Sequence, residues 1–320
     1  MEERIIDAGE VRLRAMVEGS GPLVLMVHGF PESWYSWRHQ IGAIAAAGFT
    51  ACAIDVRGYG GSDKPHAVDA YAMERLIADN VGVADALSPG APAILIGHDW
   101  GAPIVWNSAL IRPDRFRAVA ALSIPYQGVS PRPFAELFDL AFTQKNRFFY
   151  QAYFQAEGVA EAEAEADPRR FLRQFIYALS GDVLEGSWPA DKTADATMLD
   201  GLADCAMPLP WLSEADLDYY AAEFNHSGFR GPLNRYRNHR RDWEFLTAYK
   251  DRKIEQPALF IGGTRDLAFS MIGRSDPIEV MRRHVPNLRG AHMLEGCGHW
   301  TQQERPEEVT KLLLDWLKSL

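Results

Sequence analysis

The sequence predicts an α/β fold in which a mostly parallel sheet is covered by helices on both faces and interrupted by a helical insertion. Over about the first 125 residues, short apolar runs alternate with amphipathic helical patterns, as parallel strands joined by helices do. From residue 128 to 244 helical and aromatic segments replace this alternation, which resumes near residue 257. We therefore expect a core formed by residues 1–127 and 245–320, with a helical cap over 128–244.

The expected strands of the first core segment are short. Val11–Val17 alternates polar and apolar residues, as a half-exposed strand does, whereas the later runs are apolar throughout. Those runs are Pro22–Val27, Ala51–Ile54, Pro92–Ile96 and Val119–Ser123. Because strands of a parallel sheet are buried on both faces, such continuous runs indicate its centre.

Three helices are expected between these strands. Ser33–Ala47 has a helical pattern that stops at Gly48, a residue suited to a helix C-cap. Tyr71–Leu87 is amphipathic and is followed by a Ser-Pro-Gly turn, and Ala102–Ile111 is an apolar helix that ends before Pro113.

The rest of the chain supplies the cap and the second core segment. Helical patterns in the cap cover Phe134–Ala141, Phe148–Gln155, Phe171–Leu179 and Glu214–Phe224. Its acidic, alanine-rich run Glu157–Asp167 is interpreted as a solvated loop and helix start. Strands are expected again at Pro257–Gly262 and Ala291–Leu294, before a closing helix over Pro306–Leu317.

The amino-acid composition argues against some classes of binding partner. With 33 basic and 43 acidic residues the net charge is −10, which argues against nucleic acid or an anionic membrane as partner. The three cysteines are widely spaced and form no disulfide or metal-binding pattern. The N-terminus lacks a secretory signal, and no apolar run approaches the ~20 residues that a membrane span needs. We expect a soluble, cytoplasmic protein without a metal, and we leave a homodimer open.

The segment Gly97-His98-Asp99-Trp100-Gly101 joins an expected strand to an expected helix. Small residues two positions either side of Asp99 suit the tight turn that presents a nucleophile in hydrolases with an elbow motif. Serine is the usual residue at that position. The alternative is that Asp99 only caps the following helix, a common role for aspartate.

A carboxylate nucleophile limits the reaction. Attack on an acyl carbon would give an unproductive anhydride, so a saturated carbon with a leaving group is the better target. An epoxide and a carbon–halogen bond both meet that description. Serine-type esterase activity is disfavoured by Asp99 itself.

An elbow nucleophile needs an orienting acid and a general base, expected downstream in that order. Asp266 ends the segment Gly262–Asp266, which directly follows the apolar run Pro257–Ile261, at the end of a strand where open α/β sheets carry functional groups. His299 lies in Gly-Cys-Gly-His-Trp, where the glycines at 296 and 298 suit a loop that brings an imidazole close to a neighbouring backbone. Asp251 and Asp276 are weaker candidates because neither follows a buried strand. The alternatives are a turn aspartate and a structural histidine.

An early loop completes the candidate site. His28-Gly29-Phe30-Pro31 follows an apolar strand, where such enzymes place one donor of the oxyanion hole. We expect the backbone N–H groups of Phe30 and Trp100 to be the two donors. The tight turn makes a cis Phe30–Pro31 peptide bond plausible.

The chain resembles the α/β-hydrolase superfamily and, within it, the soluble epoxide hydrolases. The resemblance is carried by HGFPESWYSWRHQI at 28–41, DVRGYGGSDKP at 55–65, IGHDWGAPIVW at 96–106 and GCGHW at 296–300. Two cap segments, YQAYFQAEGVAEAE at 150–163 and SGFRGPLNRYRN at 227–238, are similar to those that hold the lid tyrosines of that family. The resemblance therefore implies Tyr150 and Tyr236 as lid tyrosines. One departure is Arg235, where the family often has tryptophan.

The resemblance implies hydrolysis of a small apolar epoxide to a diol through an ester on Asp99, without a cofactor. Phenols stay protonated at neutral pH, so two lid tyrosines can donate to the epoxide oxygen as it gains charge. Haloalkane dehalogenases are the nearest alternative, but they usually have asparagine where Phe30 stands and lack paired lid tyrosines. Fluoroacetate-type dehalogenases have a similar elbow motif, but with arginine where this chain has Trp100, which makes them a weaker alternative. A non-catalytic receptor on the same scaffold is the alternative from another class.

Overall fold

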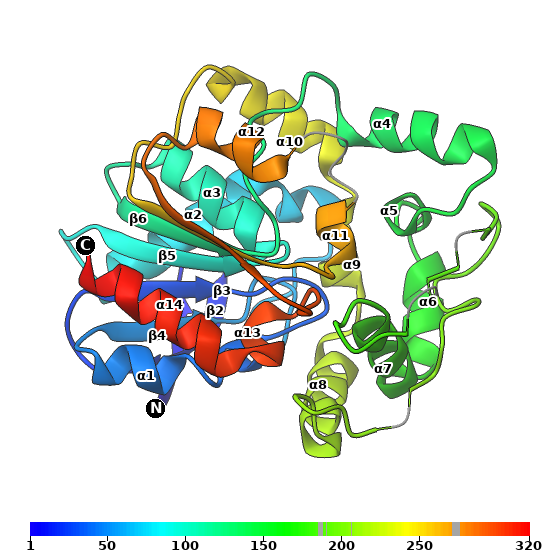
Figure 1. The fold of residues 1–320 in the computed structure, drawn as a ribbon, viewed down its shortest axis with the longest axis horizontal. Helices are drawn as coiled ribbons and strands as arrows, with labels where there is room; N and C mark the ends of the chain where they lie inside the picture. Colours follow the sequence, from blue (N-terminus) through cyan, green and yellow to red (C-terminus); the bar gives the residue numbers. More distant parts are fainter. Residues whose placement is uncertain (185–187, 190, 206, 271–275) are drawn as a thin grey trace.

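The computed structural model describes residues 1–184, 188–189, 191–205, 207–270 and 276–320. Its eight-stranded sheet has the order β1-β2-β4-β3-β5-β6-β7-β8 (Figure 1). The strands are β1 (Glu2–Asp7), β2 (Arg12–Glu18), β3 (Leu23–Val27), β4 (Thr50–Ile54), β5 (Ala93–His98), β6 (Phe116–Leu122), β7 (Ala258–Gly263) and β8 (Leu288–Leu294). Only the β1–β2 and β2–β4 pairs are antiparallel, so the expected mostly parallel sheet is confirmed.

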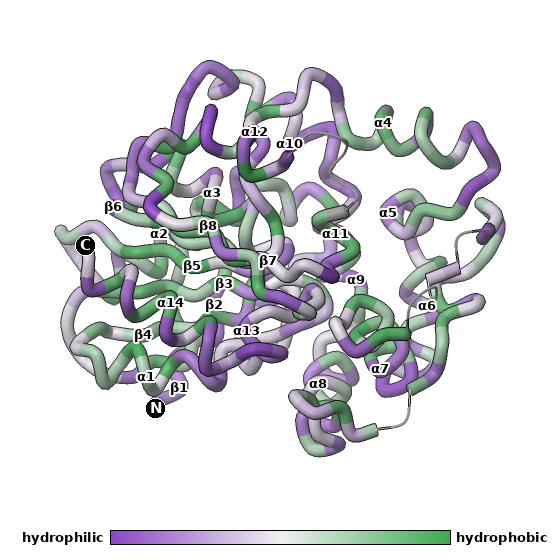
Figure 2. Tube along the Cα trace, in the orientation of Figure 1, coloured by the Kyte–Doolittle hydropathy of each residue, from purple (hydrophilic) through white to green (hydrophobic). Residues whose placement is uncertain are grey.

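The central strands β3 and β5 are buried along their whole length, and β2 alternates as expected. In Figure 2 the tube at the centre of the sheet is correspondingly green, the colour of hydrophobic residues. Alternate side chains of the central strands enter two separate apolar clusters, one on each face: Leu25 belongs to one cluster, and Val24 and Met26 to the other. Each face therefore needs its own cover of helices.

Helices from distant parts of the chain supply these covers (Figure 1). The cluster of Val24 and Met26 is completed by α1 (Ile41–Ala46) and α14 (Pro306–Lys318), which contact each other. The other face is covered by α2 (Met73–Leu87) and α3 (Gly101–Ile111). The C-terminal part of the chain, before α14, also contains α11 (Leu267–Ser270), α12 (Pro277–His284) and α13 (Thr301–Glu304).

The structure corrects some of the expected elements. The single helix expected over Ser33–Ala47 is divided into a 3-10 turn, η1 (Trp34–Trp37), and α1, because the Ser33 side chain caps an early turn at Tyr35 N. The helix expected from Tyr71 starts at Met73, after the short turn η2 (Val68–Tyr71). Strand β1 was not expected; it is exposed and is held by its pairing with β2, and so lacks an apolar pattern.

The segment expected to form the cap is helical. It contains α4 (Phe134–Ala141), η3 (Thr143–Lys145), α5 (Tyr150–Tyr153), α6 (Val159–Ala166), α7 (Pro168–Ala178), α8 (Glu214–Ser227) and α9 (Arg230–Tyr236). Helices α4 to α8 lie on one side of the sheet in Figure 1, where α7 packs against α8. The next elements, α10 (His239–Leu246) and η4 (Thr247–Tyr249), follow at once. Because α10 contacts both α4 and α2, the boundaries at 128 and 244 stay a prediction.

The acidic run of the cap is more ordered than the sequence interpretation suggested. Most of it forms α6, and Ala160 and Ala164 on this helix are buried. Glu161 is also buried and pairs with Arg237, at 2.7 Å between Oε1 and Nη1. One face of α6 therefore packs within the cap, while most residues of the run, at 157–159 and 165–167, stay exposed to solvent. Of the helices described, none is both long and apolar enough to cross a membrane.

Candidate active site

Asp99 lies at the turn between β5 and α3 in a left-handed backbone conformation, with φ of 50°. A Cβ added at Gly97 would lie 2.3 Å from the carbonyl oxygen of Gly101, and one added at Gly101 would lie 2.0 Å from that of Val27. Only glycine fits at both positions. A non-glycine residue held at positive φ costs on the order of 1–3 kcal/mol, which marks this turn as a strained position.

The side chain of Asp99 does not cap α3. The N-cap residue of that helix is Trp100, which makes no side-chain cap hydrogen bond. Instead, Asp99 Oδ1 accepts a hydrogen bond from the Phe30 N–H at 2.8 Å, and Oδ2 lies 3.1 Å from His299 Nε2. The capping alternative is therefore wrong, and the carboxylate faces the other candidate residues.

Three residues from separate loops form one hydrogen-bonded series. Asp266 follows β7 and His299 follows β8, and these strands pair in parallel beside β6 and β5. His299 Nδ1 lies 3.0 Å from each carboxylate oxygen of Asp266. The structure thus brings together the three residues that the sequence placed in the order Asp99, Asp266, His299.

The charges of this series stabilise each other. Burial alone would lower the pKa of His299, but the carboxylates of Asp266 and Asp99 hold it well above its usual value. Burial alone would raise the pKa of Asp99, whereas the hydrogen bond and charge of His299 and the Phe30 N–H keep it low. In the free protein the two carboxylates therefore favour the charged, imidazolium form of His299.

The early loop is fitted closely around Asp99. The Phe30–Pro31 peptide bond is cis, as expected. A Cβ added at Gly29 would lie 2.3 Å from Asp99 Oδ1 and 2.6 Å from the Trp100 amide nitrogen. Glycine at this position therefore lets the loop approach until the Phe30 N–H reaches the carboxylate.

The two lid tyrosines come from different helices of the cap and meet at an edge-to-face contact. Tyr150 begins α5 and Tyr236 ends α9, with ring centroids 6.0 Å apart. The Tyr236 ring also lies 5.2 Å from that of Trp100 and 5.6 Å from that of Phe30. This packing ties the cap residues to the two loops that hold the candidate oxyanion donors.

Both phenols are held in the protonated state. Burial, and then the negative charge of Asp99, raise the pKa of Tyr150 and of Tyr236 above the usual value. Gln151 Nε2 donates a hydrogen bond to the Tyr150 oxygen at 2.7 Å. Because that amide group only donates, the phenol proton of Tyr150 is left to donate elsewhere.

Sequence reasoning did not single out a buried polar network beside the series. His98 Nδ1 lies 2.8 Å from Glu32 Oε2, and His98 Nε2 lies 2.8 Å from the carbonyl oxygen of His299. The Ser123 hydroxyl donates to the same carbonyl oxygen at 2.6 Å. Burial alone would raise the pKa of Glu32, but His98 holds it below its usual value. Glu32 and His98 lie in the motifs at 28–41 and 96–106. A polar residue among apolar neighbours was the sequence signal that could have pointed to this network.

Arg235, the departure noted in the sequence, is buried behind Trp100. Its guanidinium carbon lies 4.6 Å from the centre of the Trp100 ring. The guanidinium donates to the main-chain oxygen of Tyr71 and pairs with Asp242, whose other oxygen accepts the N–H of Met73 at 2.7 Å. Arg235 thus fixes the end of α9 to the start of α2.

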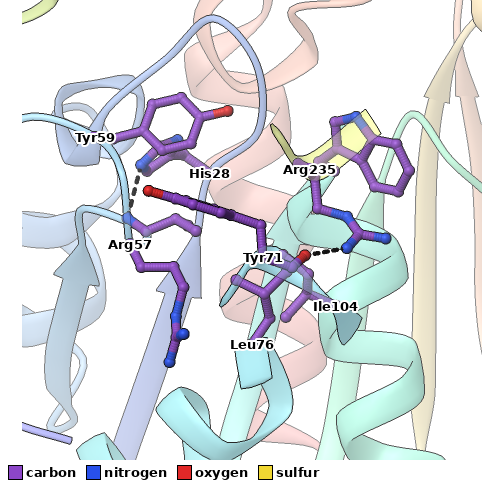
Figure 3. Close-up of a pocket in the computed structure, with 9 residues that line it drawn as sticks. His28, Arg57, Tyr59, Tyr71, Leu76, Ile104 and Arg235 are labelled. Carbon is purple, nitrogen blue, oxygen red and sulfur yellow. Dashed lines mark hydrogen bonds between the residues drawn. The ribbon is translucent and has the colours of Figure 1, made fainter. Parts of the chain in front are cut away.

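Figure 3 shows Arg235 and Tyr71 at a small cavity that is also lined by His28, Tyr59 and Trp100. Neither Asp99 nor the lid tyrosines line this cavity, so it is separate from the hydrogen-bonded series. Across the part of the chain that the structure describes, no group of three or more His, Cys, Asp or Glu side chains is arranged to hold a metal ion.

Comparisons with known proteins agree with the fold described above. A sequence profile of the alpha/beta hydrolase fold family matches residues 22–306. Epoxide hydrolase A of Mycobacterium tuberculosis is 42% identical, covering 99% of this chain and 98% of that protein. A solved epoxide hydrolase from an endophytic Streptomyces has a TM-score of 0.94 at 48% identity, covering 99% of this chain and 95% of the other. Epoxide hydrolase A from Mycobacterium thermoresistibile gives a TM-score of 0.93 at 41% identity, covering 99% and 98%.

Proposed function

Since the chain belongs to the alpha/beta hydrolase fold family and groups there with epoxide hydrolases, we propose that it hydrolyses an epoxide to a vicinal diol through a covalent ester on Asp99. The observation that carries this proposal is the series Asp99–His299–Asp266, in which a carboxylate occupies the nucleophile turn. A carboxylate there attacks a saturated carbon, and the strained ring of an epoxide supplies one.

In the first step Asp99 attacks a ring carbon and the carbon–oxygen bond of the epoxide breaks. Oδ1 is held by the Phe30 N–H, so Oδ2 forms the new bond and Oδ1 becomes the carbonyl oxygen of the ester. The departing ring oxygen keeps the electron pair of the broken bond and takes a proton from Tyr150 or Tyr236. Their protonated state in the free protein makes them suitable acids for this strongly basic oxygen.

In the second step His299 becomes the general base. Formation of the ester removes the negative charge of Asp99, one of the two charges that hold the pKa of His299 high. The imidazolium then gives up its proton, which restores the phenol that protonated the substrate. Neutral imidazole, kept in place by Asp266, takes a proton from water as that water attacks the ester carbonyl.

The attack places negative charge on the former Oδ1 atom. The Phe30 N–H already donates to that oxygen, and the N–H of Trp100 is the second donor in this proposal. Loss of one such donor costs on the order of 3 kcal/mol in related acyl chemistry. Collapse of this intermediate breaks the ester carbon–oxygen bond, and the departing alkoxide takes the proton of the new carboxyl group. The diol is thus released, Asp99 returns to its carboxylate form, and His299 keeps the proton taken from water.

The test is diol formation from a terminal aryl epoxide and a trans-disubstituted epoxide, with halide release from a bromoalkane measured in parallel. We expect diol without halide. His299→Gln should accumulate the ester, seen as a mass increase of the protein equal to that of the epoxide, and Asp99→Asn should form none. Halide without diol, or epoxide binding without turnover, would overturn the proposal.

The substrate class, the cellular location and the oligomeric state are also proposals. We infer a small apolar epoxide as substrate, because the rings of Phe30, Phe154 and Trp100 pack against the lid tyrosines. The acidic composition argues against a nucleic-acid partner, and the three free cysteines support a cytoplasmic location. Size-exclusion chromatography with light scattering tests whether the chain forms a homodimer.

A further inference from the structure

A junction between the cap and the loop of His299 lies beside the imidazole. The N–H of His299 donates to the carbonyl oxygen of Leu179, at the end of α7, at 2.9 Å. The indole N–H of Trp300 donates to the carbonyl oxygen of Ile176 at 2.8 Å. The cap therefore contacts the main chain of His299 itself, in addition to carrying the lid tyrosines.

Glu304 stands at the centre of this junction, outside the hydrogen-bonded series of the site. Its Oε2 atom accepts the N–H of Gly181 at 2.9 Å and that of Gly298 at 2.8 Å, and its Oε1 atom accepts the N–H of Trp300 at 3.0 Å. Gly298 and Trp300 flank His299, whereas Gly181 belongs to the turn after α7. One carboxylate thus joins both sides of the His299 loop to the cap.

The two segments approach so closely that only glycine fits. A Cβ added at Gly298 would lie 2.2 Å from the Gly181 nitrogen, and one added at Gly181 would lie 2.3 Å from the Gly296 carbonyl oxygen. A shift of the cap turn would therefore move the His299 loop with it.

Retaining a carboxylate in this position is costly. Glu304 is only 5% exposed, and burial raises its pKa. The three hydrogen bonds that compensate all come from main-chain N–H groups. An amide side chain offers one acceptor oxygen and so cannot accept from both sides as the carboxylate does. The cost is offset only if the cap turn and the His299 loop are held together.

The loop of Asp266 is attached to the same cap turn. The guanidinium of Arg265 donates to the carbonyl oxygen of Gly181, and to that of Val183 at 2.8 Å. Arg265 directly precedes Asp266 and is exposed. Asp266 orients the proposed base and His299 carries it. Both therefore lie next to segments that are hydrogen-bonded to residues 181–183.

We propose that Glu304 is a positioning residue for His299, which it holds in register with the cap through Gly181. This inference rests on the proposed function, because it concerns the step that His299 performs. Glu304 contacts neither Asp99 nor the lid tyrosines, and in ester formation His299 only hydrogen-bonds to Asp99, so that step depends on Glu304 less than hydrolysis does. Hydrolysis of the ester depends on it strongly, since a misplacement of about 1 Å in a reacting group costs up to ~10²-fold in rate.

The test compares the two half-reactions in Glu304→Gln with styrene oxide as probe. Single-turnover mixing gives the rate of ester formation, and the decay of the protein adduct by mass spectrometry gives its hydrolysis. We expect hydrolysis to slow about ten-fold or more, with ester formation within about two-fold of the original, so that kcat and KM fall together. Loss of general stability would not separate the two steps in this way.

The matched control is Glu163→Gln. Glu163 is also a glutamate that accepts two main-chain N–H groups, those of Met198 and Leu199, each at 2.9 Å, but it lies within the cap. We expect both half-reactions to be unchanged in this variant. Equal slowing of hydrolysis in Glu163→Gln and Glu304→Gln would overturn the proposal, as would an unchanged hydrolysis rate in Glu304→Gln.

Arg265→Met provides a second measurement at an exposed residue, in case Glu304→Gln does not fold. It releases residues 181–183 from the Asp266 loop, and we expect the same selective slowing of hydrolysis to a smaller extent. If both half-reactions slow equally, or neither does, the junction does not position His299. His299→Gln separates this result from the proposed function: absence of an adduct in that variant contradicts the ester mechanism itself.

Discussion

The core half and the cap half of the proposed site are held in place by different kinds of contact. Around Asp99 the backbone itself is constrained: the nucleophile has positive φ, and a side chain at Gly29 or Gly97 would collide with neighbouring atoms. Tyr150 and Tyr236 are instead held by ring contacts with each other and with Phe154. A strained main chain leaves the nucleophile a single position, whereas side-chain packing lets the donors adapt to a substrate.

This comparison predicts that the core half tolerates no change at its reacting atom. In Asp99→Asn the amide is too weak a nucleophile to open the epoxide, so we expect diol formation to fall on the order of 10⁴-fold or more. Initial rates of diol formation measure the effect. Asp114→Asn, on the protein surface, serves as the control and should keep its activity. Ester formation by freshly purified Asp99→Asn protein would contradict the assignment of Asp99 as the nucleophile.

The cap half should lose activity in steps, because two phenols share one role. We expect Tyr150→Phe or Tyr236→Phe alone to slow ester formation about 10²-fold, as loss of a general acid does, and the double variant to slow it further. Single-turnover rates with and without each hydroxyl test this. Tyr153→Phe, also on α5, is the control, because its hydroxyl donates to Glu163 at 2.8 Å. If Tyr150→Phe and Tyr236→Phe both retain full rates, the tyrosines only pack.

The attachment of α9 to the core predicts a loss of stability. Arg235→Met leaves Asp242 buried without its cation, which costs about 3–5 kcal/mol. We expect the double variant with Asp242→Asn to recover part of that loss, since the Asn oxygen can still accept the Met73 N–H. Denaturant unfolding gives the free energy of unfolding of the single and the double variant. Arg240→Met removes an exposed arginine of the adjoining helix and should change the unfolding free energy by less than about 1 kcal/mol.

The smallest expected effect concerns pH. Asp266 holds the pKa of His299 above its usual value, and ester hydrolysis needs neutral His299. Hydrolysis therefore rises as the pH rises through the pKa of His299 in the ester and is lost as the pH falls. Removing the charge in Asp266→Asn lowers that pKa, so we expect the acid limb of hydrolysis to move to lower pH by about one unit or more. An unmoved limb in single-turnover profiles would assign the titration to another group.

The sequence by itself determined the features that depend on short-range pattern. Apolar runs such as Ala51–Ile54 predicted the buried strands because burial on both faces leaves no polar position. The spacing of small residues around Asp99 predicted the elbow, because the steric limits of a tight turn are local. The order of Asp266 and His299, each after a strand, followed from the rule that loops at the carboxyl ends of parallel strands meet.

Tertiary structure alone decided how these loops contact one another. Nothing local indicated that Glu304 would join the loop of His299 to Gly181, 123 residues away, or that Arg235 would pair with Asp242 behind Trp100. Strand β1 was not predicted for the same reason: it is held by its pairing with β2, and its residues show no apolar pattern. Hydrogen bonds between distant polar groups depend on which surfaces the fold brings together, whereas strands and turns depend on sterics and burial within a few residues.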